Sequence, residues 1–246
     1  MKVVGVLQAR MGSTRLPGKI LAPVIDTFPM LAVQAMRLSG ADVEWWLATS
    51  TDPTDDVTEF WGKELGLKVF RGDVENVLSR FLAISEITNA DWIVRATGDD
   101  PFMNGEMVTL MIDSLKNVHQ DVDLLCDLPS ARQFPLGFLP ELVRSTALKR
   151  IDKEITESNA FHRSHVTSFL ITQSCEAFRV ESFKSRPNWR WTVDTIQDLE
   201  MARSIFAALG SKWQHARYSQ IVELLDSMPD LAVMNAGINQ KSIELG

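Results

Sequence analysis

The chain has 246 residues, of which 45% are hydrophobic, enough for a substantial core in one large α/β domain. Its 32 acidic and 25 basic residues give a net charge of −7, which excludes a broad nucleic-acid-binding surface and favours a small anionic ligand. No apolar run approaches the length of a membrane span and no signal-peptide pattern opens the chain, so we expect a cytoplasmic protein without membrane contact.

Short apolar runs alternate with amphipathic stretches through the first half of the chain. This alternation predicts a doubly wound, mostly parallel sheet. The expected strands cover residues 3–7, 44–49, 67–70, 92–96 and 122–126. The expected helices cover residues 30–38, 55–65, 74–87 and 106–116.

The rhythm changes after residue 127, where prolines and glycines become frequent, and we expect an insertion over 127–190. Within it the sequence predicts helices over 141–153 and 161–170, and a strand pair over 177–182 and 190–193. Two helices, over 196–209 and 219–228, close the chain. No repeat or long linker occurs, so residues 1–126, 127–190 and 191–246 are expected to be parts of a single domain.

The turn after the first expected strand, QARMGSTRLPGK over residues 8–19, has the composition of a polyphosphate-binding loop. Arg10, Arg15 and Lys19 supply three cations, while Gly12 and Ser13 leave backbone N–H groups free for anionic oxygens. The spacing matches neither the P-loop nor the dinucleotide-binding pattern. Ligands of open α/β sheets bind beyond the carboxyl ends of the strands, which is where this turn lies. The alternative is a solvated basic turn.

Two later turns carry candidate metal carboxylates. Asp99 and Asp100 directly follow the strand over 92–96 and suit a hard cation such as Mg²⁺, although an aspartate there can instead cap the next helix. Asp194 follows the aromatic run over 189–192 and is either a second metal carboxylate or, with Thr195, the N-cap of the helix that begins at 196.

Histidine and cysteine give weaker signals. His162 and His165 lie three residues apart on an expected helix, but they lack a third ligand for zinc, and His165 is kept as a candidate pocket residue. Cys126 and Cys175 are too few and too far apart in sequence for a disulfide framework, so no thiol role is indicated.

Five blocks of the chain resemble the spore-coat polysaccharide cytidylyltransferase-like family, which is itself similar to bacterial enzymes that activate acidic sugars such as KDO and sialic acid with CTP. These blocks are QARMGSTRLPGKIL (8–21), ATSTDPTDD (48–56), FRGDVENVLSRF (70–81), RATGDDP (95–101) and WTVDTIQDL (191–199). The resemblance implies a three-layer α/β/α sandwich with a mostly parallel sheet. It also implies a dimerising insertion, and hence a homodimer.

The resemblance assigns roles to individual residues. It implies phosphate binding, and a catalytic role for the three cations, at Arg10, Gly12, Ser13, Arg15 and Lys19. It implies nucleotide contacts at Leu7, Gln8, Ala9, Arg71, Arg95, Thr97 and Gly98. It implies Mg²⁺ as the cofactor, held by Asp99 and Asp194, and sugar binding at Glu141 and His165.

The function implied is transfer of CMP from CTP to an acidic sugar, with the base selected by backbone groups at 7–9 and by the loop after Arg95. The alternatives are a glycosyltransferase that uses a nucleotide sugar and a noncatalytic nucleotide-binding subunit. Leu139 stands where family members commonly have an acid, and Ser164 and Ser168 replace a common glutamate and proline. These departures fall on the sugar side and leave the nucleotide half intact.

Overall fold

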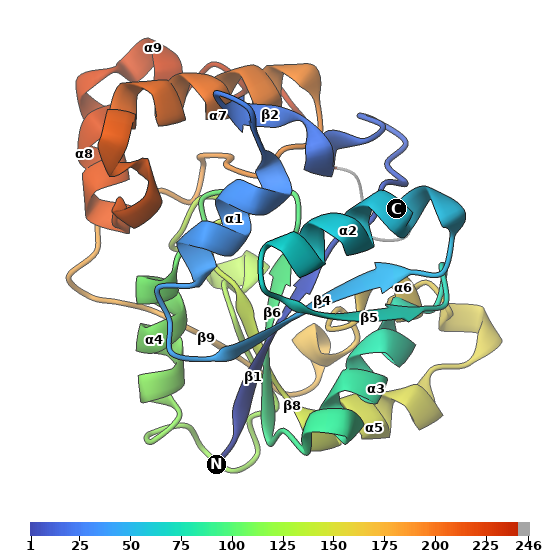
Figure 1. Ribbon diagram of the computed structural model, residues 1–246. Helices are drawn as coiled ribbons and strands as arrows, with labels where there is room; N and C mark the ends of the chain where they lie inside the picture. Colours follow the sequence, from blue (N-terminus) through green and yellow to red (C-terminus); the bar gives the residue numbers. More distant parts are fainter. Residues whose placement is uncertain (241–246) are drawn as a thin grey trace.

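The computed structural model describes residues 1–240, in which seven strands form the main sheet in the order β5-β4-β1-β6-β8-β7-β9 (Figure 1). The strands are β1 (Val3–Gln8), β4 (Glu44–Ser50), β5 (Lys68–Gly72), β6 (Trp92–Thr97), β7 (Leu124–Cys126), β8 (Glu141–Arg144) and β9 (Cys175–Ala177). A separate antiparallel pair, β2 (Pro23–Ile25) and β3 (Phe28–Pro29), precedes the first helix.

Four of the five strands expected in the first half form the predicted parallel sheet, whereas the strand expected over 122–126 is the shorter β7, which pairs antiparallel with β8. Strands β1, β4, β5 and β6 are mutually parallel where they pair. Gln8 at the end of β1 lies beside Ala48 of β4 and Thr97 of β6, so these strands end at one edge of the sheet. The loops that follow β1 and β6 therefore emerge side by side.

The segment expected to be an insertion contributes two strands to the main sheet. Strand β8 lies antiparallel between β6 and β7, and β9 pairs with β7 in parallel. A helix was expected from residue 141, but residues 141–144 are strand and the helix begins at Ser145. Leu142 and Val143 are both fully buried, because both faces of the sheet are covered. A strand of only four residues, with two adjacent buried residues at its centre, shows no alternation of apolar and polar side chains. The sequence pattern therefore could not distinguish it from the start of a helix.

The expected strand pair over 177–182 and 190–193 is wrong. The observed strand ends at Ala177, and the second segment makes a single bridge between Leu136 and Arg190. Its apolar character instead serves packing, since Trp191 and Val193 are buried side chains of the core.

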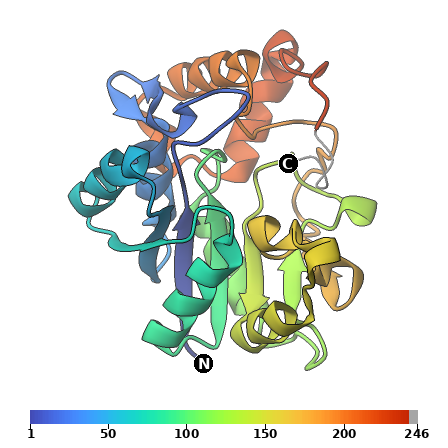
Figure 2. The ribbon, with the colours of Figure 1, turned by 90° about the vertical axis from the view of Figure 1, so that its right-hand side faces the viewer.

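Helices cover both faces of the sheet, which confirms the three-layer arrangement. One core cluster includes Leu7 and packs beneath α1, α4, α7 and α8, while the other includes Val4 and Val6 and packs beneath α3 and α5. Helices α3 and α5 lie side by side in both ribbon views (Figures 1 and 2). The α-helices are α1 (Met30–Leu38), α2 (Asp56–Glu64), α3 (Val77–Thr88), α4 (Gly105–Ser114), α5 (Ser145–Glu154), α6 (His162–His165), α7 (Ile196–Leu209), α8 (Tyr218–Ser227) and α9 (Pro229–Ala232).

Six short 3₁₀ helices complete the elements of residues 1–240: η1 (Lys19–Leu21), η2 (Pro53–Asp55), η3 (Pro129–Ala131), η4 (Glu157–Asn159), η5 (Leu170–Thr172) and η6 (Gly210–His215). None of the helices in this part of the chain is both long enough and apolar enough to cross a lipid bilayer.

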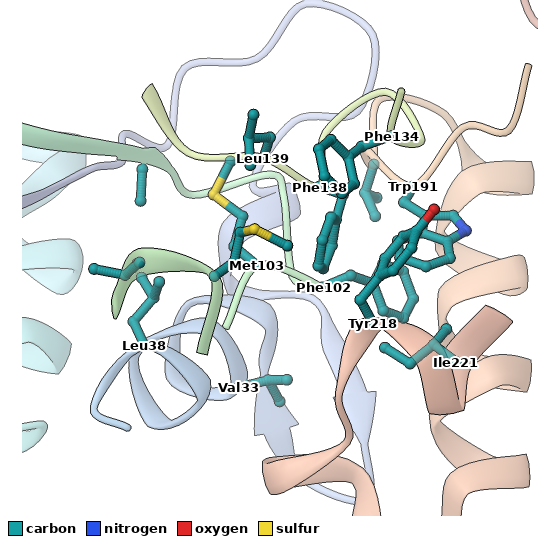
Figure 3. Packing of buried hydrophobic residues seen from close by; sticks show 14 of the residues in the cluster. Val33, Leu38, Phe102, Met103, Phe134, Phe138, Leu139, Trp191, Tyr218 and Ile221 are labelled. Carbon is teal, nitrogen blue, oxygen red and sulfur yellow. The ribbon is translucent and has the colours of Figure 1, made fainter. Parts of the chain in front are cut away.

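An aromatic cluster fixes two loops at the edge of the sheet where β6 ends. Figure 3 shows Phe138, Trp191 and Tyr218 packed together, with ring centroids 5.2 Å apart for Phe138 and Trp191 and 4.9 Å apart for Phe138 and Tyr218. Tyr218 is the first residue of α8. The loops around residues 134–138 and 189–193 are thereby held against this helix, and they place the residues that follow Trp191 beside the end of β6.

Candidate active site

A cavity of about 420 Å³ opens at the edge where β1 and β6 end. The side chains that line it come from the loop after β1, the loop after β6, the region 126–141 and the segment after Trp191. They include Arg15, Arg95, Thr97, Asp99, Asp100, Cys126, Asp127, Arg132, Gly137, Leu139, Glu141, His165, Thr192, Asp194 and Gln240.

Lys19 joins the two predicted metal carboxylates beside this cavity. Its Nζ atom donates to Asp99 Oδ2 at 2.7 Å, to Asp194 Oδ1 at 2.8 Å and to the Val193 carbonyl oxygen at 2.9 Å. Burial alone would lower the pKa of the Lys19 ammonium, but the two carboxylates outweigh burial and raise it. Asp99 and Asp194, which are 80 and 175 positions from Lys19 in the sequence, thus meet at its ammonium group.

Asp194 is surrounded by three cations. Besides Lys19, the Arg15 Nη2 atom lies 2.8 Å and the Arg190 Nη2 atom 2.6 Å from Asp194 Oδ2. Burial would raise the pKa of the Asp194 carboxyl, but Lys19, Arg15 and Arg190 hold it below its usual range. Asp194 is therefore ionised at neutral pH, and the surrounding positive charge suits an incoming anion.

Asp194 does not cap the helix that follows it. Thr195 is the N-cap of α7, and its side chain accepts a hydrogen bond from the Asp198 N–H. The Asp198 carboxylate accepts in return from the Thr195 N–H at 2.9 Å and the Asp194 N–H at 3.0 Å. This capping box leaves the Asp194 carboxylate free to face the cavity, so the capping alternative for Asp194 is wrong.

The adjacent acids Asp99 and Asp100 differ in environment. The Asp99 side chain is partly exposed and contacts Lys19. Asp100 is buried, accepts a hydrogen bond from the Thr97 hydroxyl and packs against Gly137. Burial, and then the neighbouring Asp99 charge, raise the pKa of Asp100 to about 8. Both acids line the cavity, but Asp99 contacts Lys19 and is the more exposed, whereas Asp100 is bonded within its own turn.

The first part of the phosphate loop is tied to two neighbouring loops. Arg10 Nη1 donates to the Val74 carbonyl oxygen at 3.2 Å, and the Met11 N–H donates to Asp55 Oδ1 at 2.7 Å. Ser13 Oγ accepts weakly from the Leu16 N–H at 3.4 Å, and Gly12 is exposed. The loop is held in place while Gly12 remains open to solvent.

Backbone groups of residues 8 and 9, which were predicted to contact the base, form hydrogen bonds to β4 and to the loop after β6. The Ala9 N–H donates to the Ala48 carbonyl oxygen, and the Gln8 carbonyl oxygen accepts from the Gly98 N–H at 2.7 Å. A Cβ on Gly98 would lie 2.8 Å from the Cβ of Ala9, so a glycine is required where these loops meet. Leu7 is buried in the core.

Glu141 links three elements on the opposite wall of the cavity. Its Oε2 atom accepts from Arg95 Nη1 at 2.7 Å and from the Thr167 hydroxyl at 2.6 Å. His165 lines the same cavity. Both residues predicted for sugar binding therefore lie at the candidate site, together with Arg95.

Several predicted nucleotide-binding residues do not line the cavity, namely Leu7, Gln8, Ala9, Arg10, Gly12, Ser13, Lys19, Gly98 and Arg71, and of these Arg71 is bound to a different part of the fold. Its guanidinium donates to Asp56 Oδ1 at 2.6 Å, to Glu59 Oε2 at 2.8 Å and to the Ser50 and Asp52 carbonyl oxygens. Arg71 is absent from the residues within 1–240 that line the cavity. It joins β5 to the start of α2.

Sequence reasoning missed Asp127, Arg132, Arg190 and Gln240. Asp127, Arg132 and Gln240 line the cavity, and Arg190 bonds Asp194. Asp127 directly follows β7, so its position at a strand end was a usable signal, whereas Arg132 comes from a region without a motif to mark it. Arg190 could have been identified as a site residue, because it lies between Trp189 and Trp191 in an apolar segment, where a buried charge requires a partner of opposite charge.

Within residues 1–240 no group of three or more histidine, cysteine or acidic side chains is placed to enclose a metal ion. Asp99 and Asp194 nevertheless converge on the single ammonium of Lys19. Two carboxylates that are close enough to bind the same ammonium group could also supply two oxygen ligands to one Mg²⁺ ion, with phosphate and water completing its coordination.

Comparison with known proteins identifies the family of the chain. The sequence model of the cytidylyltransferase family matches residues 4–205. The spore coat polysaccharide biosynthesis protein SpsF of Bacillus subtilis is 30% identical over 240 residues, which covers 94% of this chain and 96% of the relative. The 3-deoxy-manno-octulosonate cytidylyltransferase of Escherichia coli is 24% identical, with 99% of this chain and 88% of the relative covered.

Solved structures are similar over the same length. A cytidylyltransferase from Leptospira borgpetersenii superposes with a TM-score of 0.87 at 29% identity, covering 98% of this chain and all of the other. A CMP:2-keto-3-deoxy-manno-octonic acid synthetase complexed with CTP shares the fold, with a TM-score of 0.61 at 19% identity and coverage of 84% and 99%. The chain therefore belongs to the cytidylyltransferase family.

Proposed function

We propose that the protein transfers CMP from CTP to an acidic sugar for polysaccharide biosynthesis and releases pyrophosphate. The observation that carries this proposal is the convergence of Lys19, Asp99 and Asp194 beside a cavity at the carboxyl edge of the parallel strands. Family membership supports it, and the pocket is of a size that suits a nucleotide and a small acceptor.

The cations of the phosphate loop bind the triphosphate in this proposal. Arg15 and Lys19 now contact carboxylates, and a phosphate oxygen offers each of them an equivalent charge-assisted hydrogen bond. Arg10 lies in the same loop. Arg190 stays on Asp194 when the other two cations move to phosphate, so that carboxylate keeps a counter-charge.

The reaction is an in-line displacement at the α-phosphorus. A sugar oxygen forms the new P–O bond, the bond to the β-phosphate oxygen breaks, and pyrophosphate leaves with the charge that the loop cations stabilise. Mg²⁺ bound by Asp99 and Asp194 would supply further stabilisation of that charge. No side-chain nucleophile is required.

The acceptor lies on the wall formed by Glu141, Arg95 and His165. The Arg95 guanidinium already pairs with Glu141, so this wall offers both a cation and an acceptor for sugar hydroxyls. Leu139 lines the cavity as an apolar surface at the position where the family resemblance implies an acid. We infer that the acceptor differs here in the group that meets residue 139.

The decisive experiment measures pyrophosphate release with CTP, Mg²⁺ and a panel of acidic sugars, with ATP, GTP and UTP as base controls. We expect turnover with CTP in the presence of one or more of the sugars, and a large loss in Asp194→Asn. Hydrolysis of UDP-sugars without pyrophosphate release from CTP would favour a glycosyltransferase. Thermal stabilisation by CTP without turnover on any sugar would favour a noncatalytic subunit.

We further propose that the protein acts in the cytoplasm as a homodimer joined through residues 127–190. Light scattering on the purified chain tests the oligomer, with a mass of two chains expected against 27.6 kDa for one.

A further inference from the structure

The two cysteines, which seemed unrelated in sequence, lie next to each other at the edge of the sheet. Cys126 ends β7 and Cys175 begins β9, and these strands pair in parallel with Leu124 opposite Cys175 and Cys126 opposite Ala177. Side chains alternate along a strand, so Cys126 and Cys175 point to the same face as diagonal neighbours. Their Sγ atoms are 2.9 Å apart.

This separation is short for two thiols that merely pack. The sulfurs would have to approach by a further ~0.9 Å to reach the disulfide bond length of about 2.05 Å. Both cysteines are free thiols. The pairing of β7 with β9 already brings the two sulfur atoms to this separation, so the cross-link joins neighbours of the folded chain.

The two thiols differ in surroundings. Cys175 is half-buried, whereas Cys126 is buried within the protein and lines the cavity. The Cys175 thiol, burial and then the Glu141 charge raise the pKa of the Cys126 thiol. A dissolved oxidant therefore meets Cys175 first, and Cys126 is the resolving partner.

We propose that Cys126 and Cys175 form a reversible disulfide that links the wall of the cavity to the edge strand β9. The oxidant is a small-molecule disulfide such as oxidised glutathione. The Cys175 thiolate attacks it, giving a mixed disulfide and one released thiol. Cys126 then attacks Cys175 Sγ with loss of its proton, and the second small-molecule thiol leaves. Two protein thiols are oxidised and one disulfide is reduced to two thiols.

The cross-link acts where the cavity wall begins. Asp127, the residue after Cys126, lines the cavity, and so does Ile171, which lies in η5 just before Cys175. A covalent bond between β7 and β9 would therefore restrict the movement of Asp127 and Ile171 relative to each other. The residues of the phosphate side, Lys19, Asp99 and Asp194, lie on other elements.

The test uses the full chain in glutathione buffers of increasing oxidised fraction, followed by rapid acid quenching and mass spectrometry. We expect the wild type to lose two hydrogens and to yield a linked pair of peptides that contains Cys126 and Cys175. Dithiothreitol should restore both thiols. The bond should also raise the Tm by roughly 5 °C or more, because it constrains a long loop of the unfolded chain.

Cys175→Ser is the matched control, since it keeps the size of the side chain and cannot form the bond. We expect no linked peptide and no rise in Tm for this variant. If the wild type keeps two free thiols, or forms only mixed or intermolecular disulfides, the proposal is overturned. This result does not depend on turnover and is therefore separate from the success or failure of the proposed transferase function.

A second measurement examines the cavity. With whichever acidic sugar gives turnover, the oxidised and reduced enzymes should differ by about twofold or more in KM for the sugar, while KM for CTP stays constant. Identical sugar KM values for the two forms would overturn the claim that the bond acts on the cavity.

Discussion

Arg190 and Asp194 form a buried ion pair in which Arg190 Nη2 lies 2.6 Å from Asp194 Oδ2. The same guanidinium donates through Nε to Asp198 Oδ1 at 3.0 Å, and Asp198 in turn accepts from the backbone N–H of Asp194. Arg190 therefore helps to fix the direction of the Asp194 carboxylate, together with Arg15, which contacts the same oxygen atom. Lys19 and Arg15 are expected to move onto phosphate, and Arg190 is not.

The variant Arg190→Leu should lower the free energy of unfolding by about 3–5 kcal/mol, because truncating one partner leaves two buried carboxylates undercompensated. Urea unfolding at pH 7 measures this loss. Arg190→Lys keeps the charge and should recover part of the stability. It should still raise the Mg²⁺ concentration needed for half-maximal turnover, because an ammonium cannot hold Asp194 and Asp198 through two separate nitrogen atoms.

An exposed ion pair is the control for this prediction. Lys184 Nζ lies 2.7 Å from Asp226 Oδ2, and the Lys184 side chain is 59% exposed. Lys184→Met should cost less than about 1 kcal/mol. Similar losses in Arg190→Leu and Lys184→Met would show that burial of the Arg190 pair has no energetic consequence.

The variant Lys19→Met should lower kcat for pyrophosphate release by about a hundredfold or more, the size of effect seen when a preorganised charge donor is removed. Steady-state turnover with CTP measures the loss, and circular dichroism confirms that the variant is folded. Lys19→Arg keeps the charge but replaces the single ammonium that contacts both carboxylates, so it should restore only part of the rate. A folded Lys19→Met enzyme with wild-type kcat would contradict the proposed role.

The sequence was sufficient to predict the parallel pairing of β1, β4, β5 and β6 and the meeting of the loops that follow β1 and β6. Arg15 and Lys19 stand in one loop, and Asp99 ends a strand-like run, so local pattern and the rule for strand ends locate them. Asp194 needed family resemblance, because spacing alone allowed it to be a helix cap. The structure settles this by giving the capping role to Thr195.

The sequence pattern could not predict features that depend on contacts between residues far apart in the chain. Strand β8 has only four residues, with buried Leu142 and Val143 on opposite faces, so no alternation is visible, and its place between β6 and β7 follows from long-range pairing. Cys126 and Cys175 meet only because β7 and β9 pair. Arg71 is a similar case, since its bonds to Asp56 and Glu59 depend on how α2 packs beside β5.

Asp127 should make stability fall as the pH rises. Burial, the largest influence, raises its pKa from 3.8 in the unfolded chain to about 6. The folded protein then binds this proton more tightly than the unfolded chain does, so the stabilisation is present below pH 4 and is lost as the pH rises through 6. We therefore compare the free energy of unfolding of Asp127→Asn with that of wild type. After allowance for solvent screening, this difference should shift in favour of the variant by roughly 1–2 kcal/mol as the pH rises from about 4.5 to 7.5.

Urea unfolding of both proteins at the two pH values tests this prediction. Asp226→Asn provides the control, because the side chains of Lys184 and Arg186 lower the pKa of Asp226 from 3.8 in the folded protein, so this carboxyl titrates below the pH range of the experiment. The stability of Asp226→Asn relative to wild type should therefore stay constant between about pH 4.5 and 7.5. If the difference between Asp127→Asn and wild type is the same at both pH values, Asp127 does not titrate in this range.

Gly137 should tolerate no side chain, for two separable reasons. Its φ of 87° lies in the left-handed region, and an added Cβ would lie 2.5 Å from Asp100 Oδ1 and 2.6 Å from Thr192 Cβ. Gly137→Ala should therefore lower the free energy of unfolding by about 3 kcal/mol or more. It should also weaken thermal stabilisation by CTP, because Asp100 and Thr192 line the cavity.

Gly66→Ala separates the two reasons. Gly66 has a similar φ of 73°, but nothing lies within 4 Å of the Cβ that would be added. This variant carries the backbone strain alone and should cost roughly 1–2 kcal/mol, with CTP stabilisation unchanged. The difference between the two variants measures how rigidly the loop around residue 137 packs on Asp100 and Thr192. If both variants lose the same stability, these contacts yield to an added methyl group, and the packing of Gly137 cannot be what holds Asp100 in its buried position.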